Sequence, residues 1–416
     1  MLTQAFYTGI SGIKSNQTAI DVTADNLANV STIGYRGYNT EFASLLEDSI
    51  NTTVANPSNT IGIGSRVQTT SMTSEVGSMV LTERNTDIAI RGDGWFGVTD
   101  DTNTQYTRAG NFTFDANNDL VTNDGFYVLG TKGGNISGEE LTSVVDEVKL
   151  GDVNSQEKLR FPKNLVYPAE PTTNADFFGN LGLEDELRTI GATVVDEDSN
   201  RNSLQLLFSK SDTQLPPGIQ WDVTATTKSI DGETLYDTQS GILNFDANGS
   251  LISNTLTSIN NNGTDIDINL GSDFSGIVVT NGPVSSSSTT NGTIGGELQG
   301  YEINRNAEVI ATFTNGAQSS VGKIAVYHFQ NDLGLDRVSG TRFAKSSNSG
   351  EAIFFKDANG DNILGATVNN YTLENSNIKL ENALTELIIL QRSFDANSKT
   401  ISAADEMMQK ALQMDA

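Results

Sequence analysis

FYTGISGIKSNQTAIDVTADNL, residues 6–27, carries apolar side chains at every seventh position. They are Phe6, Ile13, Ile20 and Leu27, with Ile10 on the adjoining position. An interval of seven places side chains on one face of an α-helix, along which a second helix can pack. Because residues 1–30 have few turn signals, the stretch predicts one amphipathic helix.

The C-terminal end of the chain repeats this pattern. The residues spaced by seven are Leu373, Leu380, Leu387, Phe394, Ile401 and Met408, with Leu384 and Leu412 on the adjoining position. Two striped ends in one chain predict helices that pair lengthwise as an inner coiled-coil-like domain, residues 1–33 with 372–416. Sustained stripes of this kind predict packing along their length against other helices. The pattern alone leaves open that each helix packs on the β-core of its own chain.

The residues between the helices favour short strands joined by turns. The 39 glycines, the 7 prolines and the alternation of apolar with polar residues support strands. Residues 72–150 with 285–371 are expected to form a first β-domain. Between them, residues 151–284 are far richer in acidic than in basic residues and predict an inserted outer β-domain. The fold class is therefore α+β and multidomain, with residues 283–296 expected as a connector.

A short phrase recurs along this β-rich region. Phe-Asp-Ala-Asn stands at residues 114–117 and 245–248, and with one inserted lysine at 355–359. Each copy lies between strand-like segments and contains residues that favour turns. The phrase therefore predicts three hairpin turns.

Composition excludes several classes of function. The 25 basic and 52 acidic residues give a net charge of −27, which would repel nucleic acid. With no cysteine and a single histidine, His328, thiolate sites and chemistry that needs two histidines are excluded. The longest apolar run, residues 387–390, is too short to cross a membrane, and no cleaved signal peptide is expected. We expect no cofactor, no metal and no membrane insertion.

Three patterns resemble catalytic or binding motifs only superficially. Residues 92–97 have dinucleotide-binding glycine spacing, but no helix is predicted after them, so a turn is expected. Residues 357–362 begin like a calcium loop, but Val368 stands where a bidentate glutamate is needed. The acidic clusters at 184–186 and 196–198 predict a solvated surface rather than a glycosidase pair. His328 is expected to have a structural role.

ADNLANVSTIGYR, residues 24–36, resembles the signature that bacterial flagellar rod and hook proteins carry after their N-terminal helix. Residues 92–98, 106–112 and 120–125 resemble the first β-domain of that family, and residues 374–378 and 391–397 resemble its closing helix. The departures are Arg36, where lysine is common, and Ile33. The signature residues are Asn26, Leu27, Ala28, Asn29, Gly34, Tyr35 and Arg36.

The resemblance implies a structural subunit and not an enzyme. Hook proteins of this family carry an inserted outer β-domain, as residues 151–284 suggest here, whereas rod proteins are generally shorter. A hook subunit would polymerise with identical copies into a curved extracellular tube, a flexible joint between rod and filament. The resemblance implies that the apolar stripes of the terminal helices form the interface of this polymer. Its other partners would be the distal rod protein, the hook–filament junction protein, the hook cap and the flagellar type III export apparatus. The alternatives are a distal rod protein or a non-flagellar β-rich adhesin.

Residues 34–71 are expected to connect the first helix to the β-domain. Tyr38 and Phe42 are apolar residues that a tether would not need, so we expect them to anchor the segment between neighbouring subunits. The alternative is a flexible linker, because residues 51–60 are polar.

Overall fold

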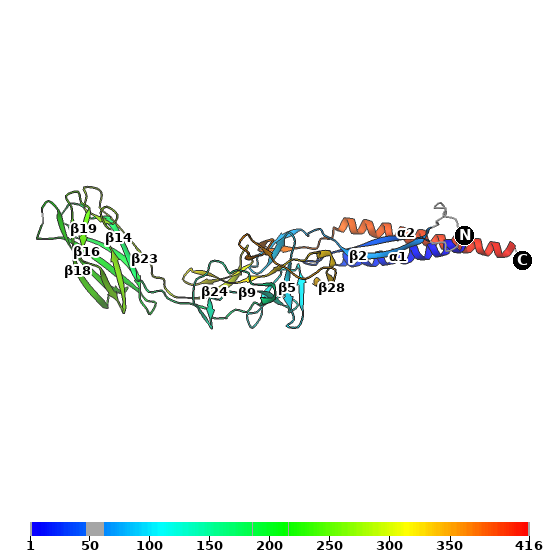
Figure 1. The fold of residues 1–416 in the computed structure, drawn as a ribbon, viewed down its shortest axis with the longest axis horizontal. Coiled ribbons are helices and arrows are strands. Elements are labelled where there is room, and N and C mark those ends of the chain that lie inside the picture. Colours follow the sequence, from blue (N-terminus) through cyan, green and yellow to red (C-terminus); the bar gives the residue numbers. More distant parts are fainter. Residues whose placement is uncertain (1, 47–61, 185, 215, 415–416) are drawn as a thin grey trace.

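The molecule is elongated, with a helical end, a central β-domain and an outer β-domain in a row (Figure 1). This computed structural model describes residues 2–46, 62–184, 186–214 and 216–414. The predicted class, α+β and multidomain with paired terminal helices, is confirmed. Within the described residues, neither helix is long and apolar enough to span a membrane.

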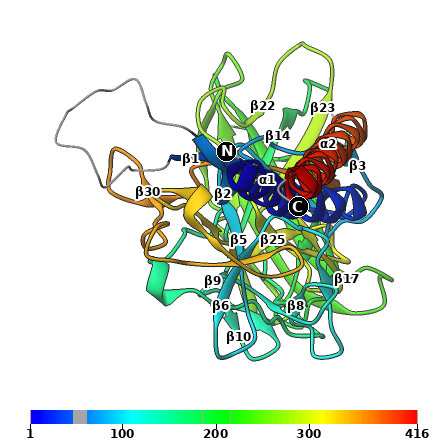
Figure 2. The ribbon, with the colours of Figure 1, turned by 90° about the vertical axis from the view of Figure 1, so that its right-hand side faces the viewer.

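Two helices lie side by side at the helical end (Figure 2). They are α1 (Leu2–Ala28) and α2 (Leu380–Met414). Two glycines of α1 lie tightly against α2: a Cβ atom added to Gly9 would lie 2.6 Å from Cγ1 of Ile401, and one added to Gly12 would lie 2.6 Å from Nδ2 of Asn397. Because the two glycines let the helices approach this closely, the contact inside one chain does not consist of large apolar residues alone.

A β-hairpin covers another side of α1. Its strands are β1 (Tyr38–Leu46) and β2 (Gly62–Met72), which pair antiparallel. Ser15 Oγ donates to the carbonyl oxygen of Ser65 over 3.0 Å, which ties the hairpin to the helix. The segment expected as a connector is thus a hairpin in its described part, because alternating β-branched and polar residues favour strands. The polar stretch 51–60 lies outside the described residues.

The C-terminal helix begins later than the spacing of apolar residues predicts. Leu373 lies in β33 (Thr372–Glu374), opposite Val80 of β3 (Met79–Leu81). The expectation that Leu373 belongs to the helical stripe was therefore wrong. The polar residues 375–377 follow the strand, and such residues compete with helix formation through their own side-chain hydrogen bonds. The interval of seven between Leu373 and Leu380 is a coincidence.

The central β-domain is built on a 15-stranded sheet, with shorter pairs beside it. Its further strands are β4 (Ile88–Arg91), β5 (Trp95–Thr99), β6 (Thr104–Thr107), β7 (Thr113–Phe114), β8 (Leu120–Val121), β9 (Tyr127–Lys132), β10 (Ile136–Ser137), β11 (Glu140–Leu141), β12 (Glu157–Lys158), β13 (Val166–Tyr167), β24 (Gly296–Ile303), β25 (Glu308–Phe313), β26 (Gln318–Ile324), β27 (Val326–Tyr327), β28 (Asp336–Ser339), β29 (Arg342–Ala344), β30 (Phe355–Lys356), β31 (Asn362–Ile363) and β32 (Thr367–Asn370). Two short 3-10 helices accompany them, η1 (Val153–Ser155) and η2 (Asp332–Gly334). Phe96, Phe112 and Val309 are fully buried in its core.

The outer β-domain consists of two five-stranded sheets with a shared core. Its strands are β14 (Asn174–Asn180), β15 (Arg188–Val195), β16 (Arg201–Lys210), β17 (Ile219–Ser229), β18 (Leu235–Phe245), β19 (Leu251–Asn254), β20 (Ser258–Asn261), β21 (Thr264–Asn269), β22 (Ile277–Val278) and β23 (Ser285–Thr290). Trp221, Phe177 and Phe208 are fully buried between the sheets. Two extended segments join this domain to the central one (Figure 1).

The boundaries of the inserted domain differ from the expected 151–284. Phe161 is buried in the central core, and β12 pairs with β9 of the central sheet. At the other end, β23 pairs with β14 inside the outer domain, although residues 283–296 were expected as a connector. Strand pairing uses backbone groups, so a run of serines can form a strand that composition does not reveal. The inserted domain begins after Glu170, which forms a bridge to Thr293.

The three predicted hairpin turns are confirmed. The recurring aspartates, Asp115, Asp246 and Asp357, each accept backbone N–H groups from residues two and four positions later, at 2.8–2.9 Å. The turns connect β7 to β8, β18 to β19 and β30 to β31. These oxygens are therefore used to shape turns.

Candidate functional site

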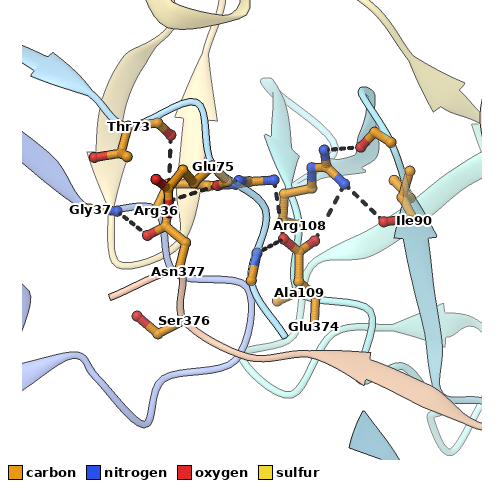
Figure 3. A network of polar contacts seen from close by, with 12 residues as sticks. Arg36, Gly37, Thr73, Glu75, Ile90, Arg108, Ala109, Glu374, Ser376 and Asn377 are labelled. Atoms are coloured by element: carbon orange, nitrogen blue, oxygen red, sulfur yellow. Dashed lines mark hydrogen bonds and ion pairs between the residues drawn. The ribbon is translucent and has the colours of Figure 1, made fainter. Parts of the chain in front are cut away.

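A buried ionic cluster joins the helical end to the central domain (Figure 3). Glu374, at the end of β33, accepts contacts from two arginines through its two carboxylate oxygens. Its Oε1 lies 3.1 Å from an amino nitrogen of Arg36, and its Oε2 lies 3.3 Å from Nη1 of Arg108. Arg36 follows α1, and Arg108 follows β6. One carboxylate thus links the chain after the first helix, the central sheet and the chain before the second helix.

The cluster is almost completely removed from solvent. The exposed fraction is 4% for Arg36, 3% for Arg108 and 1% for Glu374. Burial lowers the pKa of Arg108 to about 10, and the neighbouring Glu374 opposes that effect. Backbone carbonyl oxygens accept further N–H groups of Arg108: its Nη1 donates to Ile90 over 3.1 Å, and its Nη2 donates to Gly92. Removing the carboxylate would leave two buried cations and cost about 3–5 kcal/mol.

Asn377 adds neutral hydrogen bonds beside the Arg36–Glu374–Arg108 cluster, and together they form the joint between the helical end and the central domain. Its Oδ1 accepts the backbone N–H of Gly37 at 2.8 Å, and its Nδ2 donates to the carbonyl oxygen of Glu75 at 2.9 Å. The backbone N–H of Gly34 donates to the carbonyl oxygen of Glu374 over 2.7 Å. The segments that flank the two helices are therefore hydrogen-bonded to each other, and the helices leave the central domain from one place.

The structure gives physical roles to several signature residues. Asn26 acts like a strand partner, since its Nδ2 donates to the carbonyl oxygen of Tyr38 at 2.7 Å and its Oδ1 accepts the N–H of Tyr38 at 3.0 Å. Asn29 Nδ2 donates to the carbonyl oxygen of Asp25 at the end of α1. Gly34 has φ +67°, and a Cβ there would lie 2.4 Å from the backbone of Ala109, so only glycine fits.

The other signature residues lie around the same place. Tyr35 is buried, and burial raises its pKa to about 12. Leu27 is half-buried near the end of α1, whereas Ala28 is exposed. The structure thus brings Asn26, Gly34, Tyr35 and Arg36 together at the joint. Sequence reasoning did not identify Arg108, Glu374 or Asn377 as their partners.

The predicted interface residues fall into two groups on the helices. The half-buried ones are Phe6, Ile13, Ile20, Leu27, Leu387, Phe394, Ile401 and Met408, and the exposed ones are Ile10, Leu380, Leu384 and Leu412. The stripe is therefore only partly covered within one chain. Of the two connector residues, Tyr38 is half-buried and Phe42 is exposed.

Among the helix residues whose side chains the structure describes, four further large apolar ones are exposed although the spacing of seven omits them. They are Tyr7, Ile388, Ile389 and Met407. The apolar run 387–390 was the available signal in the sequence, because a run of four residues covers every side of one helical turn. Only Leu390 of this run is buried in the chain. Isoleucine side chains left in water on a regular helix favour a contact with another molecule.

The residues considered for catalysis are held in structural roles. His328 is buried, with Nε2 2.6 Å from the carbonyl oxygen of Leu364 and its ring against Phe355. Of residues 92–97, the first three form the turn between β4 and β5, and Trp95 to Gly97 already belong to β5. Across the described ranges, no group of three or more acidic or histidine side chains could hold a metal ion.

Comparison with known proteins places both ends and the central domain in one family. Residues 6–36 match the family model described as flagella basal body rod protein, residues 89–160 match the flagellar hook protein FlgE/F/G D1 domain, and residues 370–414 match the flagellar basal body rod FlgEFG protein C-terminal region. The three matched segments contain Arg36, Arg108 and Glu374 of the buried cluster. The three matches thus make the helix pair and the central domain similar to those of structural subunits of the flagellar rod and hook.

Relatives of full length give the particular family. The chain is 29% identical to the flagellar hook protein FlgE of Brucella suis biovar 1, over 96% of each chain. It is 26% identical to the flagellar hook protein FlgE of Borreliella burgdorferi, over 99% of each. The chain is therefore similar over nearly its whole length to flagellar hook proteins, and these matches support a structural protein rather than an enzyme.

A solved structure supports the fold. The crystal structure of the Helicobacter pylori flagellar hook protein FlgE2 matches with a TM-score of 0.53 at 14% identity. The match covers 70% of this chain and 98% of that chain. At this identity the similarity concerns the arrangement of the domains.

Proposed function

We propose that this chain is the repeating subunit of the flagellar hook, a curved helical tube that works as a flexible joint outside the cell. The observation that carries the proposal is the distribution of apolar residues on the helix pair. Inside the chain, Gly9 and Gly12 lie tightly against α2, while Ile388 and Ile389 remain exposed. Burying one such isoleucine is worth about 1.5–3 kcal/mol, so neighbouring copies would be strongly favoured partners.

Electron microscopy of the purified subunit under polymerising conditions tests this proposal. Ile389→Asp places a charge on the exposed apolar face, and we expect it to abolish tubes because a buried unpaired charge would recur in every subunit. The matched control is Ile230→Asp in the outer domain, since Ile230 is 67% exposed and Ile389 is 61% exposed. Normal tubes from Ile389→Asp, or loss of tubes from both variants, would contradict the proposed interface.

The exposed part of the β-hairpin extends this proposal. Phe42 is 46% exposed on β1 and has room to contact a neighbouring copy. Phe42→Ala should weaken the tubes and leave the unfolding of the isolated subunit unchanged. Tyr38 is half-buried beside the joint, so its replacement would also affect the subunit itself.

The remaining partners follow from the place of a hook in the flagellum. A hook subunit would contact a distal rod protein at its base, and the junction protein and the cap at its tip. It would leave the cell through the flagellar type III export apparatus without a cleaved signal peptide. The inserted outer domain favours a hook over a distal rod protein.

A further inference from the structure

A second, partly exposed contact bridges the helical end and the central domain. Arg337 of β28 donates through Nη1 to Oδ2 of Asp25, at 2.7 Å. Its guanidinium carbon also lies 5.2 Å from the ring centre of Tyr35 and 5.7 Å from that of Tyr38. One side chain of the central domain therefore holds the end of α1 and the chain that follows it.

This contact differs from the buried cluster in its access to water. The exposed fraction is 29% for Arg337 and 48% for Asp25, whereas Glu374 is 1% exposed. Ion pairs that reach solvent are weak and are screened by salt, while buried pairs are costly to open. The joint thus combines a permanent attachment at Glu374 with a contact at Arg337 that can open.

The strand that carries Arg337 is anchored through its partner strand. Phe343 of β29, which lies opposite Arg337, is buried against Trp95, with ring centres 4.9 Å apart. Arg342, which lies opposite Ser339 beside the turn, pairs with Asp124. All residues of β28 are exposed, and Gly340 turns the chain with φ +50°. Opening the Arg337 contact therefore requires no loss of core packing.

A hollow lies between the chain that follows α1 and the central domain. Its volume is about 340 Å³, and residues 31–33 line it on the side of α1. Asp124, Thr341 and Arg342 line it on the side of the central domain. The two walls thus belong to the two bodies that the joint connects, so side chains do not fill all of the space between them.

The negative charge of Asp25 favours the contact with Arg337. Asp25 lies in the last turn of α1, where the helix dipole disfavours a negative charge, and that turn has no basic residue of its own. Arg337 supplies the missing positive charge from the central domain. Loss of Arg337 would leave Asp25 unfavourably placed and would remove the cation from the two tyrosine rings.

We propose that Arg337 is the latch of a two-state joint, in which closing on Asp25 fixes the helix pair and opening lets it tilt about the buried Arg36–Glu374–Arg108 cluster. This proposal rests on the proposed function only for the purpose of the latch, because a tube that bends needs subunits whose helix pair can change its angle to the β-domains. The latch itself is a property of one chain.

Distance measurement between two spin labels on the dilute full-length subunit tests the latch. The chain has no cysteine, so Gln17→Cys on α1 and Asn103→Cys in the central domain can be labelled selectively. We expect a narrow distance distribution in the doubly labelled subunit, and we expect Arg337→Glu to remove the narrow peak. The charge swap Asp25→Arg with Arg337→Glu should restore it, and Arg305→Glu, at an exposed arginine of the same domain, should leave it intact.

Salt provides a test that needs no change at the latch. In about 1 M salt, where the screening length falls to about 3 Å, the distribution of the labelled subunit should broaden. Distributions that coincide for the background, Arg337→Glu and high salt would overturn the latch, as would a distribution that is already broad at low salt. Because these readings come from single subunits, they are distinct from a failure to form tubes, which would count against the proposed function.

Discussion

Oε2 of Glu374 lies 3.3 Å from Nη1 of Arg108, although the two residues are separated by 266 positions in the chain. The contact ties the segment before the last helix to the central sheet. The same carboxylate holds Arg36, which follows the first helix. Both helices are thereby attached to the β-domains at one buried point, so force on the helix pair would be transmitted through this cluster.

Glu374→Gln should strongly destabilise the subunit. The amide cannot neutralise two buried guanidinium groups, so we expect a loss of about 3–5 kcal/mol in the free energy of unfolding. Chemical denaturation checks this value. Glu351→Gln is the control, because its pair with Lys345 is exposed and should contribute less than about 1 kcal/mol. Equal effects of the two variants would show that the cluster does not anchor the joint.

Gly9→Val should separate the two helices, and a second change should bring them back. The new side chain would collide with Ile401, and overpacking of this kind costs about 1–3 kcal/mol. We expect reduced helix pairing and fewer tubes, with unchanged unfolding of the β-domains. Adding Ile401→Ala makes room and should restore assembly. Ala24→Val, at an exposed position of α1, should have little effect. If Ile401→Ala did not restore assembly, the proposed contact between Gly9 and Ile401 would be contradicted.

The outer domain should lose stability in acid through Asp196. Burial by itself raises the pKa of this carboxyl, but hydrogen bonds from Asn262, Asn200 and Asn202 leave it below the ordinary value. Because the pKa of Asp196 is lower in the folded state, its ionised carboxylate stabilises the outer domain at pH values above the unfolded pKa of about 3.9. This stabilisation disappears as the pH falls through the folded pKa.

Trp221 provides the reporter for this prediction because it is buried in the outer core. With Trp95→Phe as background, its fluorescence should show acid unfolding, and Asp196→Asn should lower stability at neutral pH and flatten the pH dependence. Asp198→Asn, at an exposed residue of the same turn, is the control. An unchanged acid transition in Asp196→Asn would refute the assignment.

Removing the outer domain should leave the central domain folded. The N–H of Glu170 donates to the carbonyl oxygen of Thr293 at 2.8 Å, and the reverse bond measures 2.9 Å. An Asn-Gly turn can therefore replace residues 171–292, since it fits between a hydrogen-bonded pair of strand residues. We expect the unfolding free energy of the central domain to change by less than about 0.5 kcal/mol. Tubes should still form but be straighter or more brittle, and complete loss of assembly would contradict this.

The sequence predicted the parts of this fold that depend on local patterns. The helices, the three aspartate turns and the inserted domain follow from spacing, turn chemistry and charge. The partners of Arg36 could not be predicted, because a contact with Glu374 depends on the placement of distant segments. Gly9 and Gly12 weaken a helix by propensity, and only a close neighbour reveals why they suit this one. Leu373 kept the interval of seven but belongs to a strand.

The central claim is that neighbouring subunits cover the exposed apolar face of the helix pair. The most direct test is the rate at which a maleimide reacts with Ile389→Cys in dilute subunits and in assembled tubes, since the chain has no other cysteine. The account predicts rapid reaction in the subunit and strong protection in tubes, while Ile230→Cys in the outer domain reacts more readily than Ile389→Cys in both states. Equal reactivity of Ile389→Cys before and after assembly would contradict it.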